Sequence, residues 1–132
     1  MNYLIDTDII IYSLKHNKAV IEKFQLYNAA PKSLSVITYG ELIYGARKSK
    51  SFEKNLAKVH RLIEILPVIN ISPSIMDTFG ELKASLEKRG MILDDMDLLI
   101  ASTALTHNLV LVTNNEKHFR RINGLEIENW AT

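Results

Sequence analysis

Short apolar segments alternate along this chain with longer segments of helical periodicity, and this alternation limits the fold more than any other feature. Buried strands are predicted at residues 3–5, 34–37, 68–71 and 109–112, with an edge strand at residues 125–127. Helices are predicted between them, most clearly over residues 52–66, where apolar side chains recur at steps of three and four. This order predicts an α/β fold, a three-layer α/β/α sandwich around a mainly parallel sheet of four to five strands.

The length and composition narrow the choice of function. A chain of 132 residues has the size of one domain with a core of its own, so we expect residues 1–132 to form a single domain. The absence of cysteine excludes disulfide scaffolds, thiolate catalysis and Cys-based zinc or iron–sulfur sites. The longest apolar stretch is far shorter than a membrane span of about 20 residues, and no export signal is evident, so we expect a cytoplasmic protein.

Acidic and amide side chains are found near the predicted carboxyl ends of the strands, where open α/β sheets bind their ligands. Asp6 ends the first strand, Glu41 lies one turn into the helix after the second, and Asn115 follows the fourth. Asp97 lies in the first turn of another helix. If the strands are neighbours, the carboxylates converge on one pocket.

Such a pocket requires a cation or a proton. Two carboxylates about 4 Å apart repel by about 4 kcal/mol at an effective dielectric constant of about 20. Oxygen ligands without a His or Cys cluster favour Mg²⁺ or Mn²⁺. A metal of this kind activates water and stabilises charge on a phosphoryl oxygen. The pattern therefore predicts hydrolysis of phosphodiesters.

Each of these residues also has a plainer structural interpretation. Asp6 or Asp8 can cap the first helix. Thr38 and Glu41 fit a capping box, in which the glutamate folds back onto the threonine amide. The acids of residues 94–97 can complement a helix dipole, and Asn115 can be only a cap. It is their joint placement at strand ends that favours a site.

Two other classes begin with a similar acidic pattern. The sequence Asp6-Thr7-Asp8 after an apolar strand also matches aspartyl-nucleophile (HAD-like) phosphatases. These enzymes usually need a Ser or Thr and a Lys at the ends of intermediate strands, and neither Ile37-Thr38 nor Ile71-Ser72 is followed by a convincing lysine. Receiver domains need an aspartate at the end of the middle strand, where this chain has Ser72-Pro73.

Four segments in order, and a fifth at the end of the chain, resemble the PIN-domain ribonucleases and, among them, the VapC toxins of bacterial toxin–antitoxin pairs. The matching segments are residues 4–12, 35–46, 97–101, 111–115 and 123–130. The resemblance implies a PIN-like fold and a metal-dependent endoribonuclease in which Asp6, Glu41 and Asp97 surround Mg²⁺, with Mn²⁺ as a substitute. Asn115 stands where many members keep a fourth acid, so it is expected to position water or phosphate.

The resemblance further implies substrates and partners. The substrates would be structured RNAs, chiefly tRNA or rRNA loops, whose cleavage inhibits translation. The partners would be a second copy of the chain and a VapB-type antitoxin that blocks the acidic pocket, with Tyr12, Phe24 and Tyr27 as candidate contact residues. The alternative is a PIN-like binding module without activity, against which the intact acids argue.

Basic residues flank the predicted acidic pocket in the sequence. Residues 47–61 hold six Lys or Arg and one Glu, and a second cluster lies near residue 120. Binding of phosphate groups is one interpretation and a solvated helix face is the other. The candidate RNA-binding residues are Arg47, Lys48, Lys50, Lys117 and Arg120.

Overall fold

A five-stranded parallel sheet forms the centre of the molecule, as a computed structural model describes it over all of residues 1–132. The strand order is β3-β2-β1-β4-β5, and every neighbouring pair is parallel. The strands are β1 (Tyr3–Ile5), β2 (Lys32–Ser35), β3 (Val68–Ile69), β4 (Val110–Val112) and β5 (Ile127–Glu128). The expected parallel α/β sandwich is confirmed.

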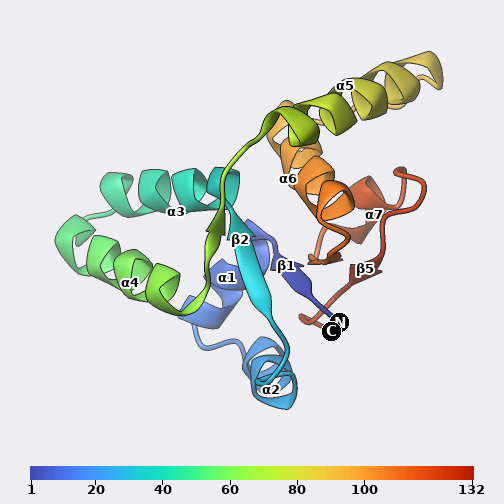
Figure 1. Ribbon diagram of the computed structural model, residues 1–132. Helices are drawn as coiled ribbons and strands as arrows, with labels where there is room; N and C mark the ends of the chain where they lie inside the picture. Colours follow the sequence, from blue (N-terminus) through green and yellow to red (C-terminus); the bar gives the residue numbers. More distant parts are fainter.

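Seven helices cover the two faces of this sheet (Figure 1). They are α1 (Thr7–Leu14), α2 (Lys18–Leu26), α3 (Val36–Lys48), α4 (Phe52–Ile65), α5 (Pro73–Lys88), α6 (Asp95–Thr106) and α7 (Glu116–Phe119). In Figure 1, α1 to α4 lie on one side of the sheet and α5 to α7 on the other. No helix is long and apolar enough to cross a membrane.

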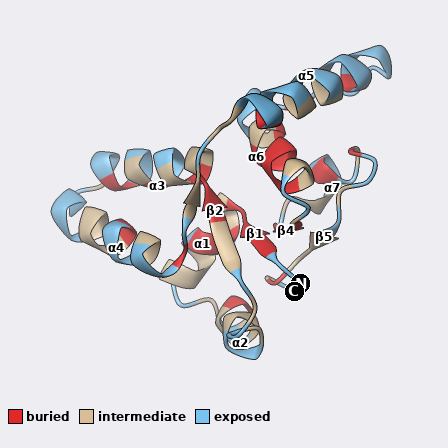
Figure 2. Ribbon diagram, in the orientation of Figure 1, coloured by how far each residue is buried: buried red, intermediate tan, exposed pale blue.

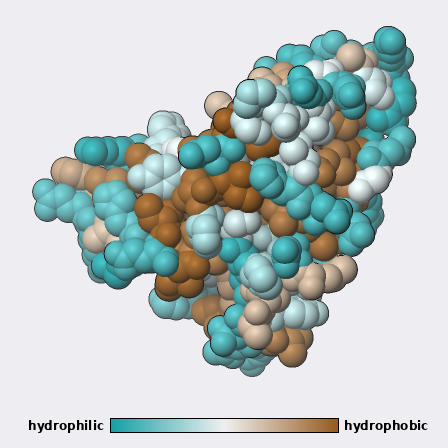
Figure 3. All heavy atoms as spheres, viewed as in Figure 1, coloured by the Kyte–Doolittle hydropathy of each residue, from teal (hydrophilic) through white to brown (hydrophobic).

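The core is divided between the two faces because side chains alternate along a strand. Tyr3 and Ile5 of β1 pack with residues of α1 to α4 and with Trp130, whereas Leu4 between them packs with α5, α6 and α7. Figure 2 shows buried residues concentrated on the strands and on the inner side of α6. On the face in Figure 3, apolar residues gather between the α3–α4 pair and the α5–α6 pair, and the outer ends are hydrophilic.

Three predicted strands have the wrong boundaries, and the fourth strand begins one residue later than predicted, at Val110. The second strand spans Lys32–Ser35 rather than residues 34–37, and it ends there because the Ser35 Oγ accepts a hydrogen bond from the Ile37 amide at 3.0 Å and caps α3. The third strand is limited to two residues, and the last one pairs at Ile127–Glu128 instead of residues 125–127. The first strand agrees with the prediction, and the helix predicted over residues 52–66 is present as Phe52–Ile65.

Candidate active site

Asp6 lies at the carboxyl end of the central strand and is 6% exposed. Its Oδ1 accepts from the Thr7 amide at 2.8 Å, and its Oδ2 accepts from the Thr113 hydroxyl at 2.7 Å. Thr113 is beside it because Ile5 and Val112 are paired in the sheet. Burial raises the pKa of Asp6 to about 7, and the charges of Asp8 and Asp97 add to this rise. The residue is therefore both a helix cap and a carboxyl that resists ionisation.

Glu41 points from α3 toward the start of α1. The Thr7 hydroxyl lies 2.6 Å from Glu41 Oε1 and 3.0 Å from the hydroxyl of Thr38, which is fully buried. The capping box predicted for Thr38 and Glu41 is therefore wrong, because Ser35 already caps the helix and Glu41 is held by α1 instead.

Asp8 and Asp97 complete the acidic group. The Asp8 Oδ2 accepts from the Asn114 amide at 3.1 Å, whereas its Oδ1 is buried without any partner. Burial raises the pKa of Asp8, and the charge of Glu41 raises it further. Burial also raises the pKa of Asp97, followed by the charges of Asp94 and Glu41. The four carboxyl groups of Asp6, Asp8, Glu41 and Asp97 thus lie within electrostatic range of one another.

This donor set fits a hard divalent cation. It consists of carboxylate oxygens, one of them buried and without a partner, and their mutual repulsion would be relieved by positive charge. No three Asp, Glu or His side chains already stand in a chelating arrangement. Asp6, Glu41 and Asp97 are the predicted ligands, and Asp8 is a fourth carboxyl that the sequence prediction left without a role.

Asn115 is at the expected place beside Asp6. Its amide donates to Thr113 Oγ1 at 3.0 Å, which links it through Thr113 to the Asp6 carboxylate. Its side chain does not cap α7 and instead lies 2.9 Å from the Nδ1 of His118. Sequence reasoning assigned no role to Thr7, Thr113 or His118, although Thr7 and Thr113 lie within two of the matching segments.

The remaining acids near Asp97 have structural partners. Asp94 caps α6 by accepting from the Met96 amide at 3.2 Å. Asp95 forms an exposed ion pair with Lys83 at 2.9 Å. Asp94 still raises the pKa of Asp97, so its charge reaches the acidic group although its side chain caps a helix.

All five candidate RNA-binding residues are exposed. Arg47 and Lys48 lie in the last turn of α3, and Lys50 follows that helix. Lys117 lies on α7, and Arg120 pairs with Glu116 at 2.8 Å. Only Arg120 has an ion-pair partner within the chain, so four of the five cations are free to bind an anion.

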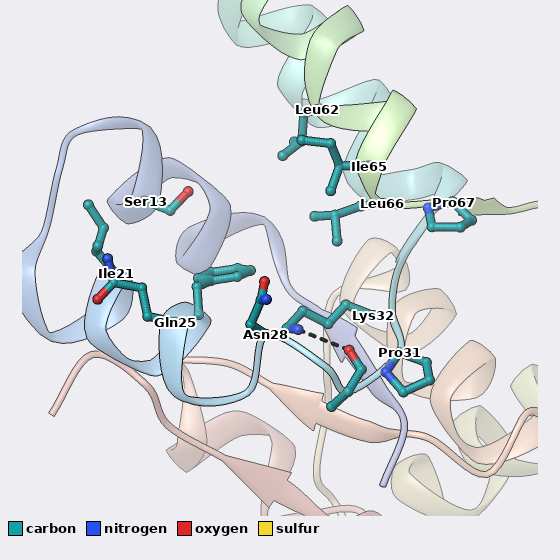
Figure 4. Close-up of a pocket in the computed structure, with 12 residues that line it drawn as sticks. Ser13, Ile21, Gln25, Asn28, Pro31, Lys32, Leu62, Ile65, Leu66 and Pro67 are labelled. Atoms are coloured by element: carbon teal, nitrogen blue, oxygen red, sulfur yellow. Dashed lines mark hydrogen bonds between the residues drawn. The ribbon is translucent and has the colours of Figure 1, made fainter.

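The largest cavity, of about 830 Å³, is not part of this site (Figure 4). Pro31, Lys32 and Pro67 line it at the amino ends of β2 and β3, away from the acidic edge. The Lys32 ammonium hydrogen-bonds to Ala30 O at 2.9 Å and also to Tyr27 O.

The early aromatic residues proposed as partner contacts have internal roles. Phe24 and Tyr27 pack against the ring of Trp130 with centroids 5.2 and 5.4 Å apart, and Trp130 is 1% exposed. The Tyr12 hydroxyl accepts from the Asn114 side chain at 3.2 Å. These three residues therefore contribute to packing and to the loop beside the acidic group.

Comparison with known proteins identifies the family to which this chain belongs. The family model of the PIN domain matches residues 3–125. Ribonuclease VapC2 of Haemophilus influenzae is 36% identical over 99% of both chains, and the tRNA(fMet)-specific endonuclease VapC of Shigella flexneri is 33% identical over the same share. The crystal structure of VapBC2 from Rickettsia felis bound to a promoter DNA fragment matches with a TM-score of 0.92 and 39% identity, over 98% of this chain and 99% of that one. The chain therefore belongs to the PIN-domain family and, within it, to the VapC ribonucleases.

Proposed function

We propose that this protein is a Mg²⁺-dependent endoribonuclease that hydrolyses phosphodiester bonds in structured RNA, in tRNA or rRNA loops, and thereby inhibits translation as a toxin. Mn²⁺ is the expected substitute. The observation that carries the proposal is the group of four carboxyls at one sheet edge, with the buried Asp8 Oδ1 left without a partner. RNA loops suit such a site because their backbone is accessible.

Asp6, Glu41 and Asp97 would hold the cation, which when bound supplies an activated water and stabilises charge on the phosphoryl oxygens. Glu41, fixed by the Thr7 hydroxyl, orients the attacking water. Asn115, fixed through Thr113, positions the phosphate. Water attacks phosphorus in line and the 3′ oxygen leaves, so the products carry a 5′-phosphate and a 3′-hydroxyl.

A VapB-type antitoxin is the proposed protein partner, and a homodimer is the proposed assembly of the toxin. The relatives from Rickettsia felis, Haemophilus influenzae and Salmonella typhimurium were solved as VapBC proteins, two of them with DNA. The apolar band between the helix pairs in Figure 3 supports a protein contact on this face.

The experiment is cleavage of total RNA by the purified chain with Mg²⁺ or with EDTA, followed by mapping of the cut ends. Asp6→Asn and Asp97→Asn should each lower the rate by about a hundredfold or more, because each removes a charged ligand. Asp95→Asn is the matched control, since the Asp95 carboxylate pairs with Lys83 on the surface. Cleavage that persists in EDTA or in both variants would refute the proposal, and an aspartyl-phosphate trapped at Asp6 would favour the phosphatase alternative.

A further inference from the structure

A second, smaller pocket opens beside Glu41 and was not anticipated from the sequence. It has a volume of about 250 Å³ and lies between α1, α3 and α4. Glu41 lines it, so the pocket adjoins one member of the acidic group of the candidate active site. We propose that it receives a nucleotide of the RNA substrate next to the scissile phosphate. This assignment rests on the ribonuclease function proposed above.

The walls of the pocket suit a nucleobase. Leu14, Leu42 and Val59 supply apolar surface, and Ile11 is 39% exposed at its edge. Bases removed from a stack are held between apolar or aromatic side chains. A base bound in the pocket would cover the exposed side chain of Ile11 during the reaction.

The polar groups of the pocket suit the rest of a nucleotide. Lys15 and Lys58 line it and neither has an ion-pair partner in the chain, so both can contact phosphate. Asn55 also lines it, and its Nδ2 donates to Ser49 Oγ at 2.8 Å. The Asn55 Oδ1 has no partner in the chain and can accept a hydrogen bond from a base.

Gly45 keeps this pocket open. It lies inside α3, where glycine is less favourable than alanine, and a Cβ at this position would meet no atom within 4 Å. Packing within the chain therefore does not require glycine here. Any larger side chain would occupy the space of the pocket, since Gly45 is one of its lining residues.

The charge of the surroundings favours RNA over an antitoxin segment as the occupant. Lys58 on the pocket wall belongs to residues 47–61, a segment with six Lys or Arg against one Glu. Its third wall is α1, and Lys15, which follows directly after α1, also lines the pocket. An RNA chain whose scissile phosphate lies at the acidic group can place the adjoining nucleotide in this pocket, because Glu41 belongs to both.

Gly45→Leu tests the assignment by filling the pocket, and its affinity for Mn²⁺ reports whether Glu41, one turn away on α3, is disturbed. Gly80→Leu is the matched control, because Gly80 is also exposed inside a helix and a Cβ there also meets no atom within 4 Å. With a labelled RNA stem-loop that spans a mapped cut site, Gly45→Leu should lower kcat/KM by about tenfold or more, mainly through KM. Gly80→Leu should stay within about twofold, and both should bind Mn²⁺ and unfold thermally like the parent.

A second measurement identifies the nucleotide that the pocket binds. The stem-loop is prepared with a single abasic site at each position around the cut, and the parent should lose cleavage at one adjacent position. The abasic site at that position should cause no further loss of cleavage by Gly45→Leu, since the leucine already fills the pocket. If Gly45→Leu does not fold, Gly45→Ala and Lys58→Ala serve in its place, and both should raise KM.

Three outcomes separate the possible failures. Equal cleavage by the parent and Gly45→Leu, or equal abasic effects in both, overturns the pocket assignment. Retained cleavage with lost binding of the antitoxin also overturns it, since the occupant is then a peptide. Absence of RNA cleavage by the parent itself refutes the proposed function, which is a different result.

Discussion

Replacing Asp6 by Asn should stabilise the metal-free protein at neutral and alkaline pH, although it should lower the cleavage rate by about a hundredfold or more. The carboxyl is buried between other acids, and its pKa is raised from 3.8 to about 7. Each unit of pKa corresponds to about 1.4 kcal/mol, so an ionised Asp6 costs the folded state about 4 kcal/mol. Asn carries no charge, has nearly the same shape and is an equally good N-cap.

The stabilisation expected of Asp6→Asn is reduced by the loss of one hydrogen bond. The Asn oxygen can still accept from the Thr7 amide, but the Thr113 hydroxyl loses its acceptor and already accepts from the Asn115 amide. That loss costs about 1 kcal/mol, which leaves a net stabilisation of about 3 kcal/mol at about pH 8.

The sign of the pH dependence follows from proton binding. Between about pH 4 and pH 7 the folded parent keeps the Asp6 proton and the unfolded chain loses it, so the stability of the parent falls as the pH rises. At about pH 5 Asp6 is mostly protonated in the folded parent, so most of the free-energy cost of its ionisation is absent. The difference in unfolding free energy between Asp6→Asn and the parent should then shrink to about 1 kcal/mol or less.

Urea unfolding followed by circular dichroism, in EDTA at about pH 8 and about pH 5, measures this difference. Asp95→Asn is the control, and loss of its exposed ion pair should change stability by less than about 1 kcal/mol at either pH. Added Mg²⁺ should stabilise the parent and not Asp6→Asn. An Asp6→Asn protein that is no more stable than the parent at pH 8 would refute the reasoning.

Three further changes test the packing, the caps and the basic surface. Trp130→Ala should destabilise the protein by about 3–5 kcal/mol in urea unfolding, because the ring is 1% exposed and holds the aromatic cluster of Tyr3, Phe24 and Tyr27. Ser35→Ala should cost about 1 kcal/mol through loss of the α3 cap, measured in the same way. Replacing both Arg47 and Lys48 by Gln should weaken RNA binding and reduce the slope of log K against log salt by about 1–2, measured by fluorescence anisotropy.

The positions of the main acids could be predicted because they depend on topology. An acid that directly follows a buried strand lies at the carboxyl edge in any parallel sheet, and Asp6 satisfies this condition without further detail. The strand order then matters, since β1 lies between β2 and β4 and so places Asp6 next to residues that follow both neighbours. Alternation of strands and helices implied the sheet but did not give this order.

The local roles of hydroxyl residues could not be predicted. A Ser at residue 35 and a Thr at residue 38 are both good caps, and the sequence Thr-x-x-Glu favoured the wrong one. The deciding contact is between Glu41 and Thr7, which are 34 residues apart. Likewise, Thr113 holds Asp6 across 107 residues, and Asn114 holds Asp8 across 106. Such contacts are set by strand pairing, which no local pattern reveals.

The central claim is that this acidic group binds the divalent cation that cleavage requires. Titration of Mn²⁺ into the metal-free protein at about pH 8, followed by calorimetry, tests it directly, with Asp97→Asn and Glu41→Gln beside Asp95→Asn. The account predicts that the parent and Asp95→Asn bind Mn²⁺ alike and that each of the other two variants loses about tenfold or more in affinity. Equal affinity in all four proteins would contradict it.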